Sequence, residues 1–162
     1  MSIPHRIQRL LDGGQLKEVT GPDADVASLW EKAVSSARDA GNPANSPDNQ
    51  YVLGYQALLQ MGTAILAAAG YRTRGAQGHH ANTFYAVAGL GIHGLEELDM
   101  RTERIRKMRA ISAYEPGSPS PEQLKELRGL LDSTLPAART WLVASRPGAP
   151  LVETEGGDPG SL

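Results

Sequence analysis

Apolar residues recur at intervals of three and four along most of this chain, and stretches rich in glycine and proline interrupt them. This spacing places the apolar side chains on one face of a helix. Alternating runs of β-branched or aromatic residues, which are typical of strands, are nearly absent. The pattern predicts six helices, over approximately residues 4–11, 25–40, 48–69, 79–90, 95–113 and 120–142.

The two longest predicted helices carry clear boundary signals. In the helix over 48–69, Gly62 lies among alanines, so we expect a second helix to cross closely there. Gly70 follows this helix as a C-terminal cap. The last helix begins with a capping box at Ser120, with proline at its first position. Pro136 lies inside this helix and is expected to kink or split it.

Long helices with short connections favour an up-and-down antiparallel bundle, so the predicted fold class is all-α, with five to six helices. Residues 1–146 are expected to form this single domain, and residues 147–162 a disordered acidic tail. The tail holds Glu153, Glu155 and Asp158, and removing these acids changes the formal charge from −2 to +1. A body so close to neutrality is not a generally basic nucleic-acid binder, so a polyanion would bind a local patch.

The chain contains no cysteine, which excludes disulfides, thiolate metal sites and cysteine nucleophiles and is typical of a reducing cytoplasm. No apolar run approaches the roughly 20 residues that span a bilayer. Residues 1–6 lack the apolar segment of a secretory signal. We therefore expect a cytoplasmic protein without a membrane span.

The most basic part of the chain is the segment 101–109, in which five of nine residues are cationic. At roughly 100° per residue, Arg101 falls inside the apolar arc of its helix and Arg109 at the edge of that arc. Arg104 flanks the opposite edge, while Arg106 and its neighbour Lys107 face outward. An arginine held against a core is costly unless it is paired or used, so this segment is the leading candidate for function.

Two interpretations of these arginines stay open. They can lie along the bundle surface and pair with acids such as Glu96, Glu97 or Glu103. Alternatively, they form a partly desolvated patch that binds phosphate, because the guanidinium fork makes bidentate contacts of fixed geometry.

Further cations lie near the fourth predicted helix. Arg72 and Arg74 belong to a predicted loop over 71–78, and His80 lies at the start of the helix that follows. Helix N-termini and arginines both favour phosphate, so these three side chains are candidates to extend the anion patch. The adjacent His79 diverges from His80 by about 100°, and the histidine spacing matches no metal motif. The sequence therefore predicts no metal site and no cofactor.

Several motifs also occur in a characteristic order over roughly residues 48–145. They are Gly70-Tyr71-Arg72-x-Arg74-Gly-x-x-Gly78-His79-His80, the arginine-rich helix, Arg109-x4-Tyr114, a proline–glycine turn and a capped final helix ending in Trp141-Leu142. This order resembles that of HEPN-domain proteins. The resemblance implies an all-α bundle of about five helices that usually forms a homodimer.

Nuclease members of the HEPN family carry Arg-x4–6-His near the end of such a helix, and two copies meet as a metal-independent ribonuclease site. Here Arg109 takes the place of the arginine, Ala110 replaces a polar residue often found after it, and Tyr114 occupies the histidine position. Tyrosine, with a pKa near 10, is a poor general base beside histidine, near 6.5. The resemblance therefore implies a non-catalytic member that binds RNA, a nucleotide or a partner such as a nucleotidyltransferase.

Three functional hypotheses follow. In a dimeric binding module, Arg104 and Arg109 contact phosphate and Tyr114 orients them. In a toxin-like, metal-independent ribonuclease of a toxin–antitoxin pair, Arg109 stabilises the scissile phosphate and Tyr114 or His80 assists proton transfer. In a purely structural or interaction bundle, the arginines only form ion pairs. The second-rank binding candidates are Arg101, Arg106, Arg72, Arg74 and His80.

Geometry limits the pairing of Arg109 with Tyr114. Five positions along a continuous helix turn the two side chains about 140° apart. They converge only if the helix breaks before Pro116 or if two chains meet at an interface.

Overall fold

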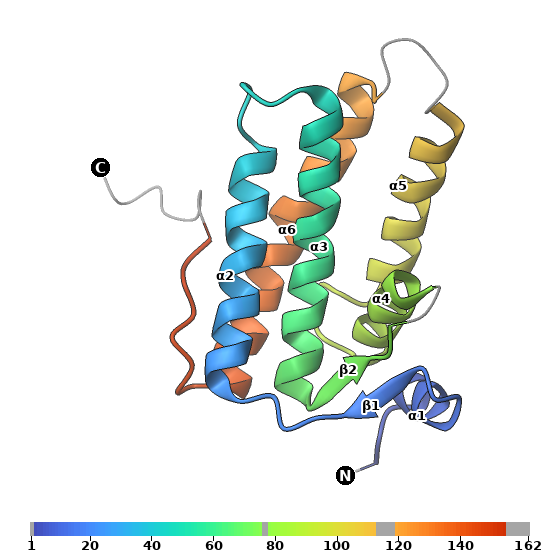
Figure 1. Ribbon diagram of the computed structural model, residues 1–162, viewed down its shortest axis with the longest axis vertical. Helices are drawn as coiled ribbons and strands as arrows, with labels where there is room; N and C mark the ends of the chain where they lie inside the picture. Colours follow the sequence, from blue (N-terminus) through green and yellow to red (C-terminus); the bar gives the residue numbers. More distant parts are fainter. Residues whose placement is uncertain (1, 76–77, 113–118, 155–162) are drawn as a thin grey trace.

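The computed structural model describes residues 2–75, 78–112 and 119–154 (Figure 1). The described chain is mostly helical, which confirms the all-α fold class. Its helices are α1 (His5–Asp12), α2 (Asp23–Ala40), α3 (Pro47–Ala69), α4 (His79–Gly89), α5 (Leu98–Ser112) and α6 (Pro121–Ser145). Two short strands accompany them, β1 (Leu16–Glu18) and β2 (Tyr71–Thr73).

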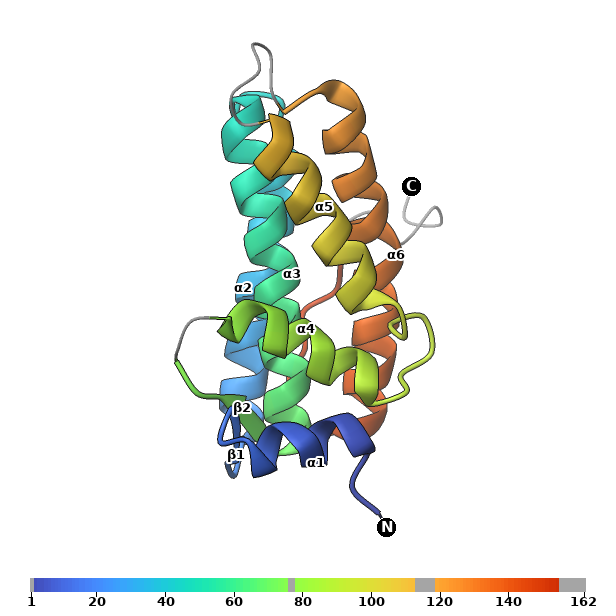
Figure 2. The same ribbon diagram turned by 90° about the vertical axis from the view of Figure 1, so that its right-hand side faces the viewer.

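Four long helices run along the long axis of the molecule and alternate in direction, in the order α2, α3, α5 and α6 (Figure 1). The helix α3 lies at the centre, in contact with α2, α4 and α6. The helix α4 crosses α3 and contacts α5, and α1 lies across the base of the bundle against α4 (Figure 2). The antiparallel bundle is therefore built on α3, with α5 at one edge.

The boundary signals act as expected. Ser46 caps α3 by accepting a hydrogen bond from the backbone N–H of Asn49 at 3.2 Å. Gly70 ends the helix in the left-handed region, at φ +95°. Both hydrogen bonds of the capping box at Ser120 are present at the start of α6. The helix α6 continues through Pro136 as one element to Ser145, so the proline does not split it.

Small residues of α3 bring its neighbours close. A Cβ added at Gly62 would lie 2.9 Å from Thr83 Cγ2 of α4, and one at Gly54 would lie 2.8 Å from Leu127 Cδ2 of α6. The crossing predicted at Gly62 is therefore confirmed, and α4 is the helix that crosses there. On the other side of α3, Trp30 of α2 is fully buried in the core.

The prediction of a loop over 71–78 is wrong at its start, because Tyr71–Thr73 forms β2. This strand pairs antiparallel with β1, with Lys17 opposite Arg72. Each strand has three residues, so no alternation long enough to indicate a strand exists in the sequence. Leu16 is the buried residue of β1 and ties the ribbon to the core.

Residues 147–154 depart from the expected disordered tail. They run back alongside α2 (Figure 1, red), and Leu151 packs against the core. Trp30 Nε1 donates a hydrogen bond to the carbonyl of Val152 at 2.8 Å, and Arg139 donates to the carbonyls of Leu151 and Val152. Backbone carbonyls accept these bonds, so the composition of the segment carries no sign of them. The remaining tail, 155–162, lies outside the described residues.

The central helix α3 is also the one helix in the described parts of the chain that is long and apolar enough to cross a bilayer. The expectation that no apolar run approaches this length is therefore wrong. Half of its most apolar window is buried inside the bundle, and a buried core helix meets the same criteria of length and composition. These criteria alone are weak evidence for a membrane span.

Candidate functional site

The arginines of α5 divide between two neighbouring helices. On the side of α6, Arg104 Nε lies 3.1 Å from Glu126 Oε1, and Arg101 Nη1 donates to Ser133 Oγ at 3.5 Å. Both arginines are exposed, so the prediction that Arg101 lies in the apolar arc is wrong. Among residues 98–109 of α5, for which burial is described, the buried ones are instead Leu98, Thr102 and Ile105.

The physical reason is the hydroxyl of Thr102. It donates to the carbonyl of Leu98 at 2.8 Å, one turn earlier, so burial leaves this polar group satisfied. A buried Arg101 would need several partners for its guanidinium. The helix therefore turns threonine toward the core and arginine toward solvent.

On the side of α3, Arg109 contacts a carboxylate and an aromatic ring. Its Nη2 atom donates to Asp48 Oδ1 at 2.6 Å, and its guanidinium carbon lies 5.5 Å from the centroid of the Tyr51 ring. The side chain of Arg109 is 27 % exposed. A carboxylate partner of Arg109 thus comes from the first turn of α3.

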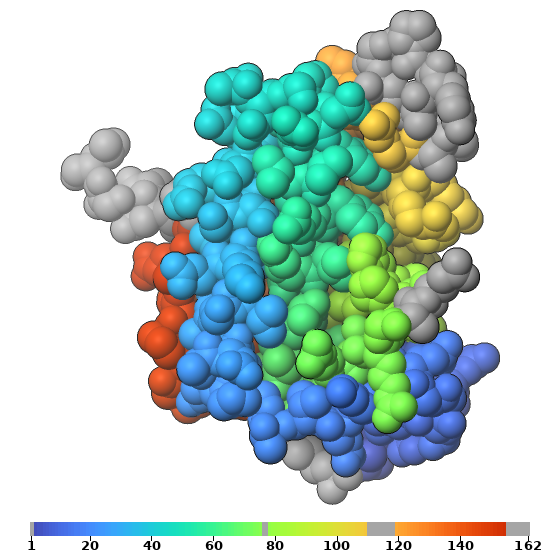
Figure 3. Space-filling view, viewed as in Figure 1, coloured from blue at the N-terminus to red at the C-terminus, as the bar shows by residue number. Residues whose placement is uncertain are grey.

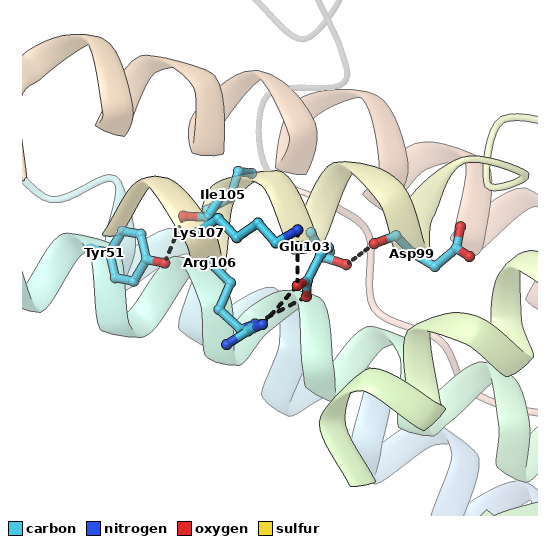
Figure 4. A network of polar contacts seen from close by, with 7 residues as sticks. Tyr51, Asp99, Glu103, Ile105, Arg106 and Lys107 are labelled. Carbon is cyan, nitrogen blue, oxygen red and sulfur yellow. Dashed lines mark hydrogen bonds and ion pairs between the residues drawn. The ribbon is translucent and has the colours of Figure 1, made fainter. Parts of the chain in front are cut away.

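Arg106 lies on the same side of α5 and forms a bidentate pair with Glu103, at 3.0 Å from Nε and 2.7 Å from Nη2 (Figure 4). Lys107 Nζ lies 3.9 Å from the same carboxylate. The hydrogen bonds from Arg106 lower the pKa of Glu103 from its usual value. The pairing with Glu103 confirms one of the partners expected for these arginines.

Aromatic rings of α3 and α4 form a row beside these arginines. Tyr51 and Tyr55 lie one turn apart, with ring centroids 6.4 Å apart and planes 12° apart. His80 lies 6.3 Å beyond Tyr55, and Phe84 meets the Tyr55 ring edge-on at 5.8 Å. Parts of α3, α4 and α5 are visible on the same face of the molecule (Figure 3).

The two tyrosines differ in exposure. Tyr51 is only 9 % exposed, and its hydroxyl donates to the carbonyl of Ile105 at 3.3 Å (Figure 4). Burial raises the pKa of Tyr51 to about 12, so the hydroxyl stays protonated. Tyr55 is half-buried, and burial raises its pKa as well. The ring of Tyr55 therefore stays partly accessible, while the ring of Tyr51 lies under Arg109.

A cavity of about 760 Å³ opens between α3, α4 and α5. His80 is one of the residues that line it, and burial, followed by the charge of His79, lowers the pKa of His80 from the ordinary histidine value. His80 is therefore neutral at pH 7 and able to accept a proton. The other side chains that matter in the wall are Tyr55, Tyr85, Asp99, Glu103 and Arg106.

The two arginines of the β-ribbon lie elsewhere. Arg72 lines a second cavity, of about 500 Å³, together with Asp25 of α2 and Thr63 of α3. Arg74 is exposed just after β2, and its backbone N–H donates to the carbonyl of Gln15 at 3.1 Å. His80 thus shares its cavity with Arg106, and Arg72 faces a different one.

Tyr114, the expected partner of Arg109, lies outside the described residues. Within the described part of the chain, no group of three or more His, Asp or Glu residues could hold a metal ion. Sequence reasoning missed Tyr51, Tyr55 and Asp48 as site residues, since both tyrosines fit the apolar stripe of α3. Their hydroxyls usually need a hydrogen-bond partner when buried, and this was the signal in the sequence that could have marked the two tyrosines as more than core residues.

Comparisons of the chain with models of protein families, with curated proteins and with solved structures each find no match. The resemblance to HEPN domains accordingly stays a hypothesis, which rests on the order of motifs in the sequence.

Proposed function

We propose that this protein is a HEPN-like, homodimeric module that binds RNA or a nucleotide through the face where α3 meets α5, without catalysing a reaction. One observation carries the proposal: the guanidinium of Arg109 lies over Tyr51, and Arg106 lies beside Tyr55 in a cavity wall. Arginine recognises phosphate by bidentate hydrogen bonds, and exposed aromatic rings stack on bases. The two kinds of contact that a nucleotide needs are therefore adjacent.

The electrostatics of this face favour an anion. Among the described residues, three cations, Arg106, Lys107 and Arg109, lie close to two carboxylates, Glu103 and Asp48. Ion pairs with exposed partners contribute only about 0–1 kcal/mol, so a phosphate can displace a carboxylate at little cost. The ring of Tyr51 and the carboxylate of Asp48 also restrict Arg109 before a ligand arrives, which reduces the entropy lost on binding.

The proposed function also includes a homodimer and a partner protein. The helix α5 lies at one edge of the bundle, where a second copy can reach it (Figure 1). In the family that the sequence resembles, two copies meet at the end of this helix, and some members bind a nucleotidyltransferase in a toxin–antitoxin pair. Arg109 lies in the last turn of α5 and would then face the dimer interface.

The decisive experiment measures binding of a short labelled single-stranded RNA by fluorescence anisotropy over a range of salt concentrations. We expect Arg109→Ala to weaken binding about tenfold and to reduce the salt slope by about one, as for loss of a phosphate contact. The matched control is Arg9→Ala, which removes an exposed arginine of α1 and is expected to change neither quantity. Equal affinities of the two variants would contradict the proposal.

One observation supports a second candidate, a metal-independent ribonuclease. His80 is neutral at pH 7 and shares its cavity with Arg106, so a base and a phosphate ligand lie close together. Arg109 is separated from His80 by the rings of Tyr51 and Tyr55, so the two do not hold one phosphate within a single chain.

The ribonuclease is tested by incubating EDTA-treated protein with labelled RNA and following cleavage on a gel. If the wild type cleaves RNA and His80→Gln does not, the ribonuclease hypothesis is supported and the non-catalytic binding module is contradicted. Absence of cleavage would exclude it. If Arg109→Ala loosens the dimer but leaves RNA affinity unchanged, the arginines have a purely structural role.

A further inference from the structure

Residues 147–154 form a strap that runs alongside α2 (Figure 1). Two side chains of the described bundle donate hydrogen bonds to its backbone carbonyls. The carbonyl of Val152 accepts from Trp30 Nε1 of α2 at 2.8 Å and from Arg139 Nε of α6 at 3.1 Å. Arg139 Nη2 also donates to the carbonyl of Leu151 at 3.2 Å. Trp30 and Arg139, the strap surface, therefore recognise the backbone of a non-helical segment.

The strap is held weakly compared with the helices. No residue of 147–154 is fully buried, and Leu151 is the apolar side chain of this described segment that packs against the core. Trp30 beneath it is fully buried. A hydrogen bond adds little net stability when water can replace one partner, and ordering the segment costs conformational entropy. We therefore expect the strap to open without unfolding of the bundle.

A turn links the strap to α6 and provides a hinge. The backbone N–H of Ala149 donates to the carbonyl of Arg146 at 3.0 Å and closes a turn over residues 147–148. Arg146 itself is fixed, because its guanidinium pairs with Asp23 at 2.9 Å and donates to the carbonyl of Ala68 at 3.1 Å. Opening of this turn redirects the strap and leaves the end of α6 in place.

A second copy of the chain carries the same strap and the same strap surface. The hydrogen bonds of the closed chain can therefore form between two copies with the same donors and acceptors, and such exchange is a low-cost route to a dimer. Short hinge loops favour it. The stretch from Pro147 to Val152 reaches at most about 20 Å when it is fully extended. The strap surfaces of the two copies must therefore lie close to each other.

We propose that two copies of this protein exchange straps, so that the strap of one copy binds the strap surface of the other. The occupant of this surface is then a second copy, whose Leu151 and Val152 carbonyls accept hydrogen bonds from Trp30 and Arg139. This inference goes beyond the proposed function, because it does not involve the face where α3 meets α5. It assigns a separate interaction surface to α2 and α6.

The first test adds the strap as a separate molecule. A fluorescein-labelled peptide with the sequence of residues 147–154 is titrated with the full chain, and fluorescence anisotropy measures its binding. Leu151→Ser in the chain weakens the internal strap, so this variant is expected to bind the peptide roughly tenfold more tightly than the wild type. The same replacement in the peptide is expected to weaken binding, because both segments compete for one surface. A peptide that binds both chains equally, or neither, would overturn the proposal.

The donors are tested in the chain that carries Leu151→Ser. Adding Arg139→Ala removes two hydrogen bonds to the peptide backbone and is expected to reduce the peptide affinity about tenfold. Adding Arg9→Ala instead removes an exposed arginine of α1 and is the matched control. Thermal melting checks that each variant folds. Equal peptide affinities of the two arginine variants would place the peptide elsewhere and overturn the proposal.

Exchange between copies is measured by light scattering of the full chain at several concentrations. Ala149→Pro removes the N–H that closes the hinge turn and is expected to raise the dimer fraction about threefold at equal concentration. Ala149→Ser keeps this N–H and is expected to keep the wild-type fraction. Adding Arg139→Ala to Ala149→Pro should restore the wild-type fraction. Equal dimer fractions of the two Ala149 variants would overturn the second copy as the occupant.

Failure of this inference is distinguishable from failure of the proposed function. A dimer that Arg109→Ala dissociates and Ala149→Pro leaves unchanged belongs to α5, and it overturns strap exchange while the proposed function stands. A dimer fraction that follows the Ala149 variants supports strap exchange, whether or not the chain binds RNA.

Discussion

The two sides of α5 carry the same residue type in different surroundings. Toward α6, Arg101 and Arg104 are exposed and contact Ser133 and Glu126. Toward α3, Arg109 lies over an aromatic ring and is only 27 % exposed. The same residue type therefore has different surroundings on the two sides of one helix. The proposed site uses the side of α3, where an aromatic ring restricts the guanidinium.

The largest expected effect is a loss of stability on replacing Ile105, whose burial holds both arginine-bearing sides of α5 in place. Ile105 is buried between the two arginine faces, and Ile105→Ala should lower the free energy of unfolding by about 2–5 kcal/mol, through lost burial and a residual cavity. Chemical denaturation measures it. Met100→Ala on the same helix, at an exposed residue, is the control and should change stability by less than about 0.5 kcal/mol. A small effect of Ile105→Ala would mean that α5 is not held by its apolar face.

The contacts of residues 147–154 with α2 and α6 do not involve α5, and a truncation tests them separately. Ending the chain after Arg146 should destabilise it by about 1–3 kcal/mol, because the indole N–H of Trp30 loses the carbonyl of Val152. A chain that ends after Thr154 keeps this contact and is the control. Thermal melting measures the difference. RNA affinity should be the same in both chains, and a change confined to the shorter chain would extend the binding face to the tail.

The comparison itself is tested by matched arginine variants. Arg106→Ala, on the side of α3, should weaken RNA binding about tenfold, whereas Arg104→Ala, on the side of α6, should change it less than twofold. Both side chains are exposed and each pairs with one glutamate, so they differ mainly in the rings nearby. Fluorescence anisotropy measures both. Equal losses would mean that net charge, and not the aromatic row, determines binding.

The smallest expected effect is a change of stability with pH that comes from His80. Since the pKa of His80 is lowered in the folded chain, the unfolded chain binds this proton more readily below the ordinary value of about 6.5. Stability is therefore expected to fall slightly as pH decreases from 7 toward 5, and less so in His80→Gln. Denaturation at several pH values measures the difference between the two proteins. A wild type that gains stability relative to His80→Gln on acidification would contradict the lowered pKa.

Local signals in the sequence account for most of the fold. The caps at Ser46, Gly70 and Ser120 and the close approach at Gly62 depend on residues within a few positions, so pattern reasoning finds them. The β-ribbon could not be predicted from the sequence, because strands of three residues are too short to show an alternating pattern. The contacts of residues 147–154 could not be predicted either, because Trp30 donates to a backbone carbonyl, which every residue has.

The candidate site was only partly predictable for a related reason. The sequence places Arg104 and Arg109 in one basic segment, but five positions on a helix turn them about 140° apart, and they face different helices. Arg109 and His80 were identified from their own neighbourhoods. Tyr55 was assigned to an apolar stripe, because nothing in its local sequence indicates that a cavity opens beside it.

The sequence by itself determined the helices, their ends and the concentration of cations in α5, because spacing and capping are properties of neighbouring residues. Only the tertiary structure decided which of these cations meet rings. The rotation of α5 is set by burial of Leu98, Thr102 and Ile105 against other helices, and this rotation turns Arg109 toward Tyr51 and Arg104 toward Glu126. The same packing pairs one carboxylate oxygen of Asp99 with Arg6 of α1 and buries the other without a hydrogen-bond partner among the described residues.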